Sequence, residues 1–493
     1  MIEGQGTTGL VLKEPTIFER SSAGRQGYAL PALDVPEKQP VRFVRHKAAE
    51  LPEVSELEVV RHFTRLSNWN YSVDLGMFPL GSCTMKYNPR INEEIAALPG
   101  LSVIHPDLPA EHCQGALEII YCLEKLLCGI SGMDECTAQP SAGAQGELTG
   151  LMIVRAFHES LGSSRKIVLV PDTAHGTNPA SSVLAGYQAI TLKSSSSGIL
   201  NLEDVRGVCD KFGRDIAAMM ITNPNTLGLF ESNIIEISQA LHNVGAQLYM
   251  DGANLNAIMG YAKPSDMGVD VMQFNLHKTF STPHGGGGPG AGPVAVRSHL
   301  APYLPNPRIR LVEGKYVTEN LKSSIGKVRG YYGNFGVLVR ALAYILQQGA
   351  DGLKQVSKAA VLNANYLRHR LSSHFAVPYR SPHFHECVLT DAIQIKENGV
   401  KTLAIAKALI DQGFHPPTIY FPLVVGGAML IEPTETESLQ ELDKLIDAFI
   451  TIAEAIRTKK DNFEHAPRKT IVGKVDEVRA ARQPILSLDD RAQ

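Results

Sequence analysis

The stretch that decides the fold class is IAAMMITNPNTLGLFESNIIEISQALHNVGAQLYMD, residues 216–251. It opens with the apolar run IAAMMIT (216–222) and closes with AQLYMD (246–251), and each run has the length of a buried strand. Between the two runs, ESNIIEISQALHNVG (231–245) has the apolar spacing of a helix. A strand, a helix and a second strand in succession are typical of two parallel strands joined by a crossover helix.

The same alternation continues on both sides of this unit. Similar apolar runs are KIVLVP (166–171), VMQFN (271–275) and PVAVR (293–297). Upstream, residues 114–128 have a helical pattern, and a second helical run contains Leu148, Leu151, Met152 and Phe157. Strands that alternate with helices predict an α/β fold, with a mostly parallel sheet and helices on both of its faces.

The chain divides into three expected parts. Residues 1–110 are rich in Pro, Gly and charge and lack regular periodicity, so we expect an extended arm with short helices. Residues 111–340 are expected to form a large α/β domain, and residues 341–493 a smaller α+β domain that follows a long helix near 333–370. The smaller domain is expected to contain strands near 384–390 and 428–432, helices near 401–412 and 438–457, and a peripheral tail after 460.

Composition argues against several classes of partner. The 47 Lys plus Arg and 50 Asp plus Glu nearly balance, which gives no electrostatic reason to expect nucleic acid or a membrane surface as a partner. No run of about 18 apolar residues predicts a membrane-spanning helix. The seven cysteines are odd in number and lack a Cys-x-x-Cys pair, which favours a reducing, cytoplasmic location. The first thirty residues carry Glu3, Glu14 and Glu19 and do not resemble a secretory signal or transit peptide.

Polar residues follow four of the apolar runs. They are Asp251 after AQLYM, Lys278 after VMQFNLH, His175 after KIVLVPDTA and Asn223 after IAAMMIT. In an open α/β sheet, ligands gather outside the carboxyl ends of the strands. We therefore expect these four residues to line one ligand site.

A carboxylate followed by a lysine in this order predicts a pyridoxal 5′-phosphate site. The carboxylate of Asp251 would keep the ring nitrogen of the cofactor protonated, and the amine of Lys278 would bind the aldehyde as a Schiff base. His175, at another strand end, would lie on the exposed face of the ring. The cofactor phosphate would then need fixed donors of its own.

The loop SAGAQGE (141–147) is the candidate phosphate site. It opens a helix, and its small residues allow backbone N–H groups to approach an anion at the positive end of the helix dipole. The candidate contacts are Ser141, Ala144 and Gln145, with Asn275 and Ser281 as possible additional ones.

Each of these residues also has a simpler interpretation. An Asp-Gly pair such as Asp251–Gly252 is a common turn, Lys278 alone is typical of a solvated charge, and His175 alone is typical of a hydrogen-bonded structural residue. Their joint order at successive strand ends favours the cofactor site.

Three competing motifs point to other chemistry. The run GGGGPG (285–290) matches the dinucleotide fingerprint, but the strand-like PVAVR follows it where that fingerprint requires a helix. His383, His385 and Cys387 alternate and suggest a zinc site, although strand residues at a domain start are the preferred interpretation, and no metal is expected. Cys83 has no nearby cysteine, which favours a packed thiol over a redox centre.

Long motifs resemble the glycine decarboxylase P-protein family of the glycine cleavage system. They are TIFERSSAGRQGYALP (16–31), PLGSCTMKYNP (79–89), PSAGAQGE (140–147), TNPNTLGLFE (222–231), LYMDGANLNA (248–257), NLHKTFSTPHGGGGPG (275–290), VRGYYGNFGVLVRALAYI (328–345), GFHPPTIYFPLVV (413–425) and EPTETES (432–438). The resemblance is to the carboxyl half, or second subunit, and implies a fold-type-I pyridoxal-phosphate enzyme similar to aspartate aminotransferase. One departure is PSAGAQG (140–146) where the family pattern is PNSGAQG, which puts the side-chain contact of Ser141 in doubt.

The resemblance also implies an activity and partners. Glycine bound to the cofactor loses carbon dioxide, and its aminomethyl group passes to the lipoyl disulfide of a lipoylated H-protein. Lys278 or His277 would handle protons during these steps. A first subunit of the P-protein would complete an α2β2 heterotetramer.

Two other functions stay open at this point. One is a different fold-type-I enzyme, such as an amino-acid decarboxylase or an aminotransferase, in which Arg329 is a candidate for binding the substrate α-carboxylate. The other is a partner subunit without catalytic activity.

Overall fold

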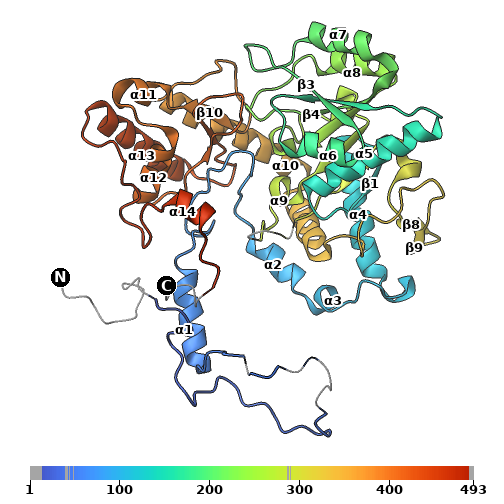
Figure 1. Ribbon diagram of the computed structural model, residues 1–493. Coiled ribbons are helices and arrows are strands. Elements are labelled where there is room, and N and C mark those ends of the chain that lie inside the picture. Colours follow the sequence, from blue (N-terminus) through green and yellow to red (C-terminus); the bar gives the residue numbers. More distant parts are fainter. Residues whose placement is uncertain are drawn as a thin grey trace. The chain divides into compact units, whose positions relative to one another are not determined.

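The computed structural model describes residues 14–38, 43, 45–47, 49–285, 288 and 290–487. The chain forms two compact units, one from residues 1–76 together with 467–493 and the other from residues 77–466. Figure 1 shows both units, coloured along the chain.

The first unit contains two helices among its described residues, α1 (Glu56–Ser67) and α14 (Glu477–Arg482). Ser55 and Glu58 form a reciprocal capping box that starts α1. The carboxylate of Glu14 accepts from His62 and is paired with Arg20 at 2.6 Å and Arg65 at 3.2 Å. These contacts tie the segment around Glu14 to α1.

The second unit is organised around a seven-stranded sheet with the strand order β1-β7-β6-β5-β4-β2-β3. Its strands are β1 (Glu135–Thr137), β2 (Ile167–Pro171), β3 (Gln188–Leu192), β4 (Ile216–Thr222), β5 (Gln247–Gly252), β6 (Val271–Phe274) and β7 (Val294–Val296). The pairings from β3 through β6 are parallel, and β7 pairs antiparallel with β6 and β1. The expected mostly parallel sheet is confirmed, because all five predicted apolar runs are strands.

Helices cover both faces of this sheet, as the alternation of elements predicts. They are α4 (Gln114–Ser131), α5 (Gly143–Ser160), α6 (Thr177–Leu184), α7 (Leu202–Phe212), α8 (Ile234–Asn243) and α9 (Leu276–Thr279). Successive strand residues point to opposite faces. Met219 of β4 packs in the core that includes α4 and α8, whereas Met220 packs in the core that includes α5.

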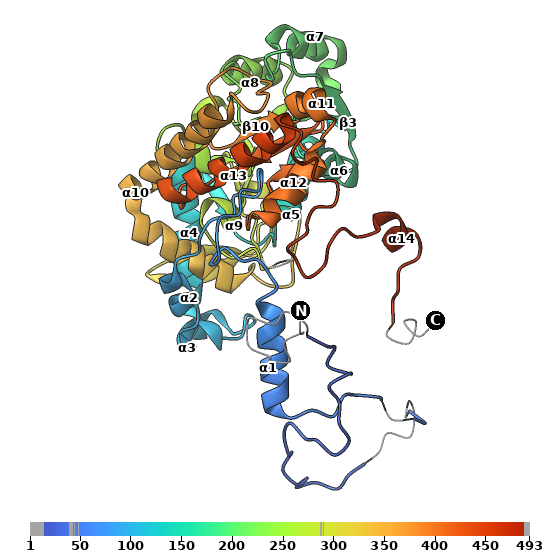
Figure 2. The same cartoon turned by 90° about the vertical axis from the view of Figure 1, so that its left-hand side faces the viewer.

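The long helix α10 (Phe335–Leu371) leads from the large sheet to a smaller one, and it packs beside α4 (Figures 1 and 2). Gly349 interrupts its helical backbone with φ 62° and ψ −176°, a conformation that glycine adopts without strain. The predicted helix over 333–370 is therefore confirmed, but as two helical segments joined at a kink.

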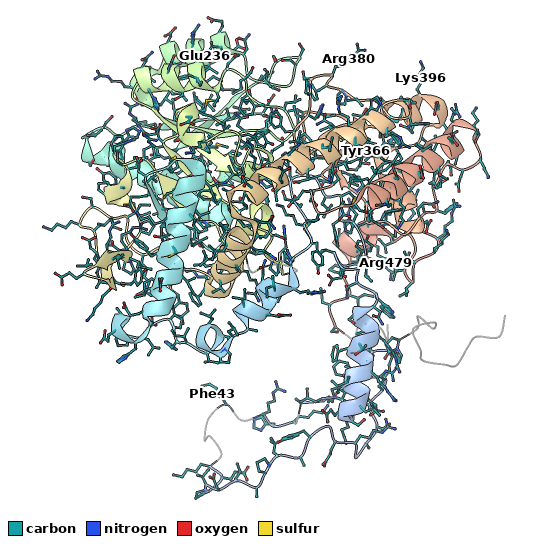
Figure 3. The ribbon with its side chains drawn as sticks, turned by 180° about the vertical axis from the view of Figure 1, so that it is seen from behind. Phe43, Glu236, Tyr366, Arg380, Lys396 and Arg479 are labelled. Carbon is teal, nitrogen blue, oxygen red and sulfur yellow. The ribbon has the colours of Figure 1, made fainter. Side chains whose placement is uncertain are left out.

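The smaller sheet has the order β10-β12-β11 and is antiparallel. Its elements are β10 (Cys387–Thr390), β11 (Thr418–Ile419), β12 (Ala428–Ile431), α11 (Ala392–Asn398), α12 (Thr402–Asp411) and α13 (Leu439–Arg457). Tyr366 of α10 points toward α13, where its hydroxyl donates to Asp443 at 2.6 Å (Figure 3). The strands and helices expected in this region are confirmed.

Residues 77–110 belong to the second unit. They contain α2 (Arg90–Ala96) and α3 (Pro99–Ser102), and Leu80 forms a β-bridge with Ile431 of the smaller sheet.

The second unit also contains an antiparallel hairpin of β8 (Arg308–Val312) and β9 (Lys315–Glu319). The two compact units are divided at residues 76 and 466. The three-part division expected from the sequence stays a prediction.

None of the helices among the described residues is long and apolar enough to span a membrane.

Candidate active site

A polar cavity lies where β4, β5 and β6 end. It is lined by Ser82, Gly143, Ala144, Glu147, His175, Thr177, Thr222, Thr226, Asp251, Ala253, Asn254, Asn275 and Lys278. Five of the ten residues predicted from the sequence are among them: Lys278, Asp251, His175, Ala144 and Asn275. Larger hollows beside α4 and α10 are mainly apolar and contain none of the ten.

Lys278 and Asp251 reach this cavity from neighbouring parallel strands. Asp251 is a residue of β5, and its partner in the β5–β6 ladder is Gln273. Lys278 lies in the single helical turn of α9 that follows β6. Because both strands run in the same direction, their carboxyl ends bring a carboxylate and an amine into one cavity.

Asp251 is held by three donors. Its carboxylate accepts from the backbone N–H of Ala253 at 3.0 Å, from the side chain of Asn178 at 3.2 Å and from that of Gln273. The side chain is nearly buried, at 3% exposed. Such a set of donors fixes the carboxylate in one orientation.

Glu147 is a second carboxylate at this site, and it is not among the residues predicted from the sequence. Its oxygens accept from the hydroxyls of Thr177 at 2.7 Å and Ser181 at 3.1 Å. Burial, together with the negative charge of Asp251, raises the pKa of Glu147 to about 7. Glu147 is the last residue of SAGAQGE (141–147) and lies one turn after the start of α5. That position next to the predicted phosphate loop is the signal that could have identified it.

His175 lies at the edge of the cavity. Its Nδ1 atom is 2.9 Å from the hydroxyl of Thr177, and its ring lies 5.8 Å from the ring of Phe421, centroid to centroid. Partial burial, together with the positive charge of Lys278, lowers the pKa of His175. The imidazole is therefore favoured in its neutral form.

The N-terminus of α5 forms one wall of the cavity. The N-cap residue, Ala142, provides no side-chain cap, so the first N–H groups of the helix are available to an anion. A Cβ atom on Gly143 would lie 2.4 Å from Nδ2 of Asn275, and this close approach requires glycine. Two polar atoms at this wall, Thr222 Oγ1 and Asn275 Oδ1, are buried and have no hydrogen-bond partner among the described residues. A phosphate group fits this wall, because it would accept from the free N–H groups at the start of α5 and from the hydroxyl of Thr222.

The other predicted residues lie beside the cavity, with their polar groups engaged elsewhere. Ser141 donates to Gln145 through its N–H and its hydroxyl, both at 2.7 Å. Asn223 accepts from the N–H of Glu231 at 3.0 Å, and Ser281 donates to the carbonyl of Tyr87 at 2.7 Å. These residues shape the surrounding loops in this structure, and their contact with a ligand stays a prediction.

His277 also lies beside the cavity rather than in its wall. Its Nε2 atom is 3.3 Å from Nδ2 of Asn275, and its ring lies edge-on to that of His284. Burial, with the neighbouring His284 and Lys278, lowers the pKa of His277 to about 3. Its role in proton transfer stays a prediction.

The three competing motifs contribute no described residue to the cavity wall. Gly286, Gly287 and Pro289 of the glycine run lie outside the described residues, and the segment after the run is strand β7. Within the described part of the chain, His385 is grouped with Glu386 and Glu432, and not with His383 and Cys387. All seven cysteines are free thiols, and burial raises the pKa of Cys83.

Comparison with known proteins shows the family of this chain. The family model of the glycine cleavage system P-protein matches residues 29–316, and that of the glycine dehydrogenase C-terminal domain matches residues 356–472. The probable glycine dehydrogenase (decarboxylating) subunit 2 of Listeria welshimeri is 52% identical over 479 residues, which are 96% of this chain and 97% of that protein. The protein of the same name from Bacillus licheniformis is 53% identical over 477 residues, 95% of this chain and 98% of the relative.

Solved structures share the fold. A glycine decarboxylase (P-protein) of the glycine cleavage system, in inhibitor-bound form, superimposes with a TM-score of 0.68 at 20% identity, over 86% of this chain and 92% of that chain. A sphingosine-1-phosphate lyase from Burkholderia pseudomallei superimposes with a TM-score of 0.61 at 12% identity, over 86% of this chain and 94% of that one. The expected fold-type-I architecture is confirmed.

Proposed function

Because this chain belongs to the glycine cleavage system P-protein family, we propose that it is the second subunit of a pyridoxal-phosphate-dependent glycine dehydrogenase (decarboxylating). The observation that carries the proposal is the meeting of Lys278 and Asp251 in one polar cavity at the ends of neighbouring parallel strands.

The residues of the cavity fit pyridoxal 5′-phosphate. Lys278 would bind the cofactor aldehyde, Asp251 would face the ring nitrogen, and the N-terminus of α5 at Gly143 would hold the phosphate. When bound, the cofactor supplies a protonated ring that takes up the electron pair left by departing carbon dioxide. His175 would lie against the ring, with Thr177 fixing the orientation of its imidazole.

Two carboxylates lie in the cavity that would hold the ring. Burial and the negative charge of Asp251 raise the pKa of Glu147 to about 7, so Glu147 holds a proton for part of the physiological range. Asp251 is held by three donors and would face the ring nitrogen. A proton on Glu147 reduces the repulsion between the two carboxylates in a buried space.

The cavity wall favours decarboxylation over transamination. Among the described residues that line it, Lys278 is the sole cation, and Arg329 is not part of the wall. An arginine would bind the substrate carboxylate in the ground state and oppose its loss as carbon dioxide. The small side chains of Ser82 and Thr226 leave polar contacts for a substrate as small as glycine.

The partners follow from the name of the relatives and from the chemistry. Their designation as subunit 2 implies a first subunit, and we place this chain with that subunit in an α2β2 heterotetramer. Glycine loses carbon dioxide, its α-carbon bonds to one sulfur of the lipoyl disulfide of an H-protein, and the other sulfur leaves and takes a proton. Seven unpaired thiols suit a reducing cytoplasm.

The test measures exchange of labelled bicarbonate into the carboxyl group of glycine, using the chain together with its first subunit. Exchange is expected to depend on the lipoylated carrier and to be lost in Lys278→Ala, while the exposed Lys211→Ala variant retains it. Transamination of larger amino acids would support the other fold-type-I enzymes instead. A protein that binds no cofactor would support a non-catalytic partner subunit.

A further inference from the structure

Three ionisable side chains outside the cavity wall meet where the smaller sheet ends. In the antiparallel ladder Cys387 pairs with Ile431, so the next residues outward, Glu386 and Glu432, lie opposite each other. His385 joins them, and all three side chains are fully buried. Nε2 of His385 lies 3.9 Å from Oε1 of Glu386 and 3.7 Å from Oε1 of Glu432, which is beyond hydrogen-bond distance.

The two carboxylates hold a strained turn, residues 81–84. Ser82 and Thr84 have φ values of 63° and 50°, in the left-handed region that side-chain-bearing residues rarely adopt. Glu386 accepts from the N–H of Ser82 at 2.8 Å. Glu432 accepts from the N–H of Thr84 at 3.0 Å and from its hydroxyl at 2.7 Å. Ser82 lines the cofactor cavity, so the pair fixes a part of that wall.

The charges around the pair allow one proton on it. Burial, together with the negative charge of Glu432, raises the pKa of Glu386 well above its usual range. Burial also raises the pKa of Glu432 to about 7, and the positive charge of Lys278 opposes both shifts. Burial, with Lys278 and Lys86, lowers the pKa of His385 to about 3, so this imidazole is neutral.

The hydrogen bonds distinguish the two carboxyls. Both oxygens of Glu432 accept from Thr84, which favours its charged form. Oε1 of Glu386 has no hydrogen-bond partner among the described residues, so this atom is free to carry the proton.

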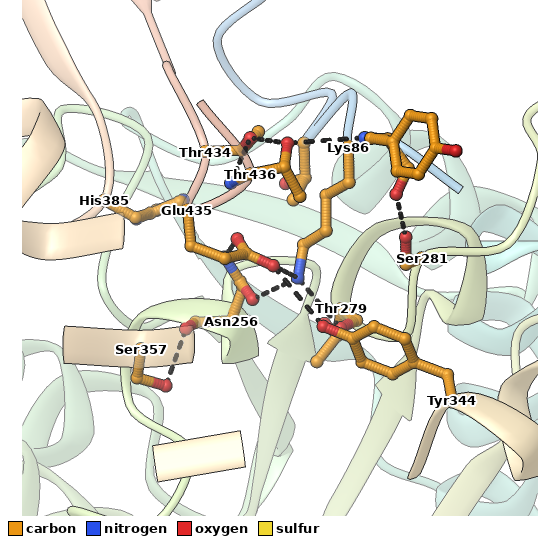
Figure 4. A network of polar contacts seen from close by, with 12 residues as sticks. Lys86, Asn256, Thr279, Ser281, Tyr344, Ser357, His385, Thr434, Glu435 and Thr436 are labelled. Atoms are coloured by element: carbon orange, nitrogen blue, oxygen red, sulfur yellow. Dashed lines mark hydrogen bonds and ion pairs between the residues drawn. The ribbon is translucent and has the colours of Figure 1, made fainter. Parts of the chain in front are cut away.

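The neighbouring Lys86 already forms an ion pair with another acid. Lys86 pairs with Glu435 at 2.7 Å and donates to Asn256 at 2.6 Å and to the carbonyl of Thr279 at 3.1 Å (Figure 4). Lys278 is the other cation whose positive charge acts on Glu432. Cys83, the other titratable group on the turn, stays a neutral thiol because burial and both carboxylates raise its pKa.

A metal ion is a less suitable occupant of this cluster than a proton. The ligand atoms of the three residues lie within 4.8 Å of one another, which is close enough for a cation. However, Thr84 already engages both oxygens of Glu432, and the positive charges of Lys278 and Lys86 act on the same cluster.

Building on the proposed function, we propose that Glu386 and Glu432 are a positioning pair that shares one proton. Glu386 carries the proton and anchors Ser82, whereas Glu432 keeps the negative charge that faces Lys278. Together they hold the turn 81–84 in the wall of the cofactor cavity and stabilise positive charge on the Lys278 nitrogen.

The test compares three glutamine variants: Glu386→Gln, Glu432→Gln and Glu454→Gln, the last an exposed control on α13. The pH midpoint of the absorbance change of the lysine-bound cofactor is measured in each. Glu432→Gln removes a negative charge and should move this midpoint downward by about one pH unit or more. Glu386→Gln exchanges one neutral group for another and should leave it at the wild-type value, as should Glu454→Gln.

Infrared spectroscopy of the cofactor-free protein provides a second, independent readout. A buried protonated carboxylic acid has a C=O band that a carboxylate lacks. Because Glu147 also holds a proton for part of the physiological range, the readout is the difference spectrum between the wild type and Glu386→Gln at neutral pH, in which the variant should show a loss of protonated C=O absorbance. If Glu432→Gln fails to fold, this measurement still decides the question.

Two results would overturn the inference. They are an unchanged midpoint in Glu432→Gln, or a wild-type minus Glu386→Gln difference spectrum without a protonated C=O band. A wild-type protein without any lysine-bound cofactor would instead refute the proposed function, and the infrared band would still report on the pair.

Discussion

Replacing Glu147 by glutamine should make the stability of the protein less sensitive to pH. In the folded protein, burial and the charge of Asp251 raise the pKa of Glu147 from 4.5 to about 7. Between these two values the folded state binds more protons than the unfolded state, so stability decreases as the pH rises. The difference of about 2.5 pH units, at ~1.4 kcal/mol each, corresponds to roughly 3 kcal/mol lost by pH 8.

Glutamine keeps the shape of the side chain and cannot ionise. We therefore expect Glu147→Gln to gain up to about 3 kcal/mol relative to the wild type when the pH is raised from 4.5 to 8. The assay is urea unfolding of the cofactor-free protein at several pH values, with the exposed Glu94→Gln as control. A difference between wild type and Glu147→Gln that does not change with pH would refute the reasoning, because Glu147 would then be charged throughout.

Three further predictions concern the cofactor and the core. Asp251→Asn should retain cofactor but lower kcat for glycine decarboxylation by roughly a thousandfold, since the ring loses its charged partner; steady-state kinetics and the bound-cofactor spectrum check this. Gly143→Ala should weaken cofactor binding at least about tenfold in a fluorescence titration, because the new Cβ would lie 2.4 Å from Nδ2 of Asn275. The control Gly115→Ala should leave cofactor binding unchanged, because open space surrounds its Cβ. Leu123→Ala, which empties a fully buried position of α4, should cost about 2–5 kcal/mol in denaturant unfolding.

The sequence predicts most of the large sheet, because its buried strands are continuous apolar runs. The run 216–222 coincides with β4, and each of the other four predicted strands is confirmed within about one residue at either end. Strand β3 (Gln188–Leu192) was missed because it is an edge strand whose half-exposed residues make no apolar run. The kink at Gly349 was missed because one glycine does not break the helical spacing around it.

The candidate site was predictable where it depends on strand order. Lys278, Asp251 and His175 lie at or just after the carboxyl ends of strands of one mostly parallel sheet, so their convergence follows from topology. Residues brought in by tertiary packing carry no such signal. Ser82 comes from a turn far upstream, and Phe421 from the loop before β12, and neither has a spacing relative to Lys278 that a sequence pattern could reveal.

The pair of Glu386 and Glu432 illustrates the same limit. The two residues are joined by the antiparallel register of β10 and β12, and that register depends on which faces of the smaller sheet are buried. The alternation of His383, His385 and Cys387 suggested a common face, yet His385 turns toward the two glutamates instead.

The most direct measurement of the central claim is the identity of the lysine that binds the cofactor. The purified protein is loaded with pyridoxal 5′-phosphate, reduced with borohydride and digested, and the modified peptide is identified by mass spectrometry. We expect the whole adduct on the peptide that contains Lys278. An adduct on the peptide of Lys86, a buried lysine beside the site, or spread over surface lysines, would contradict the account.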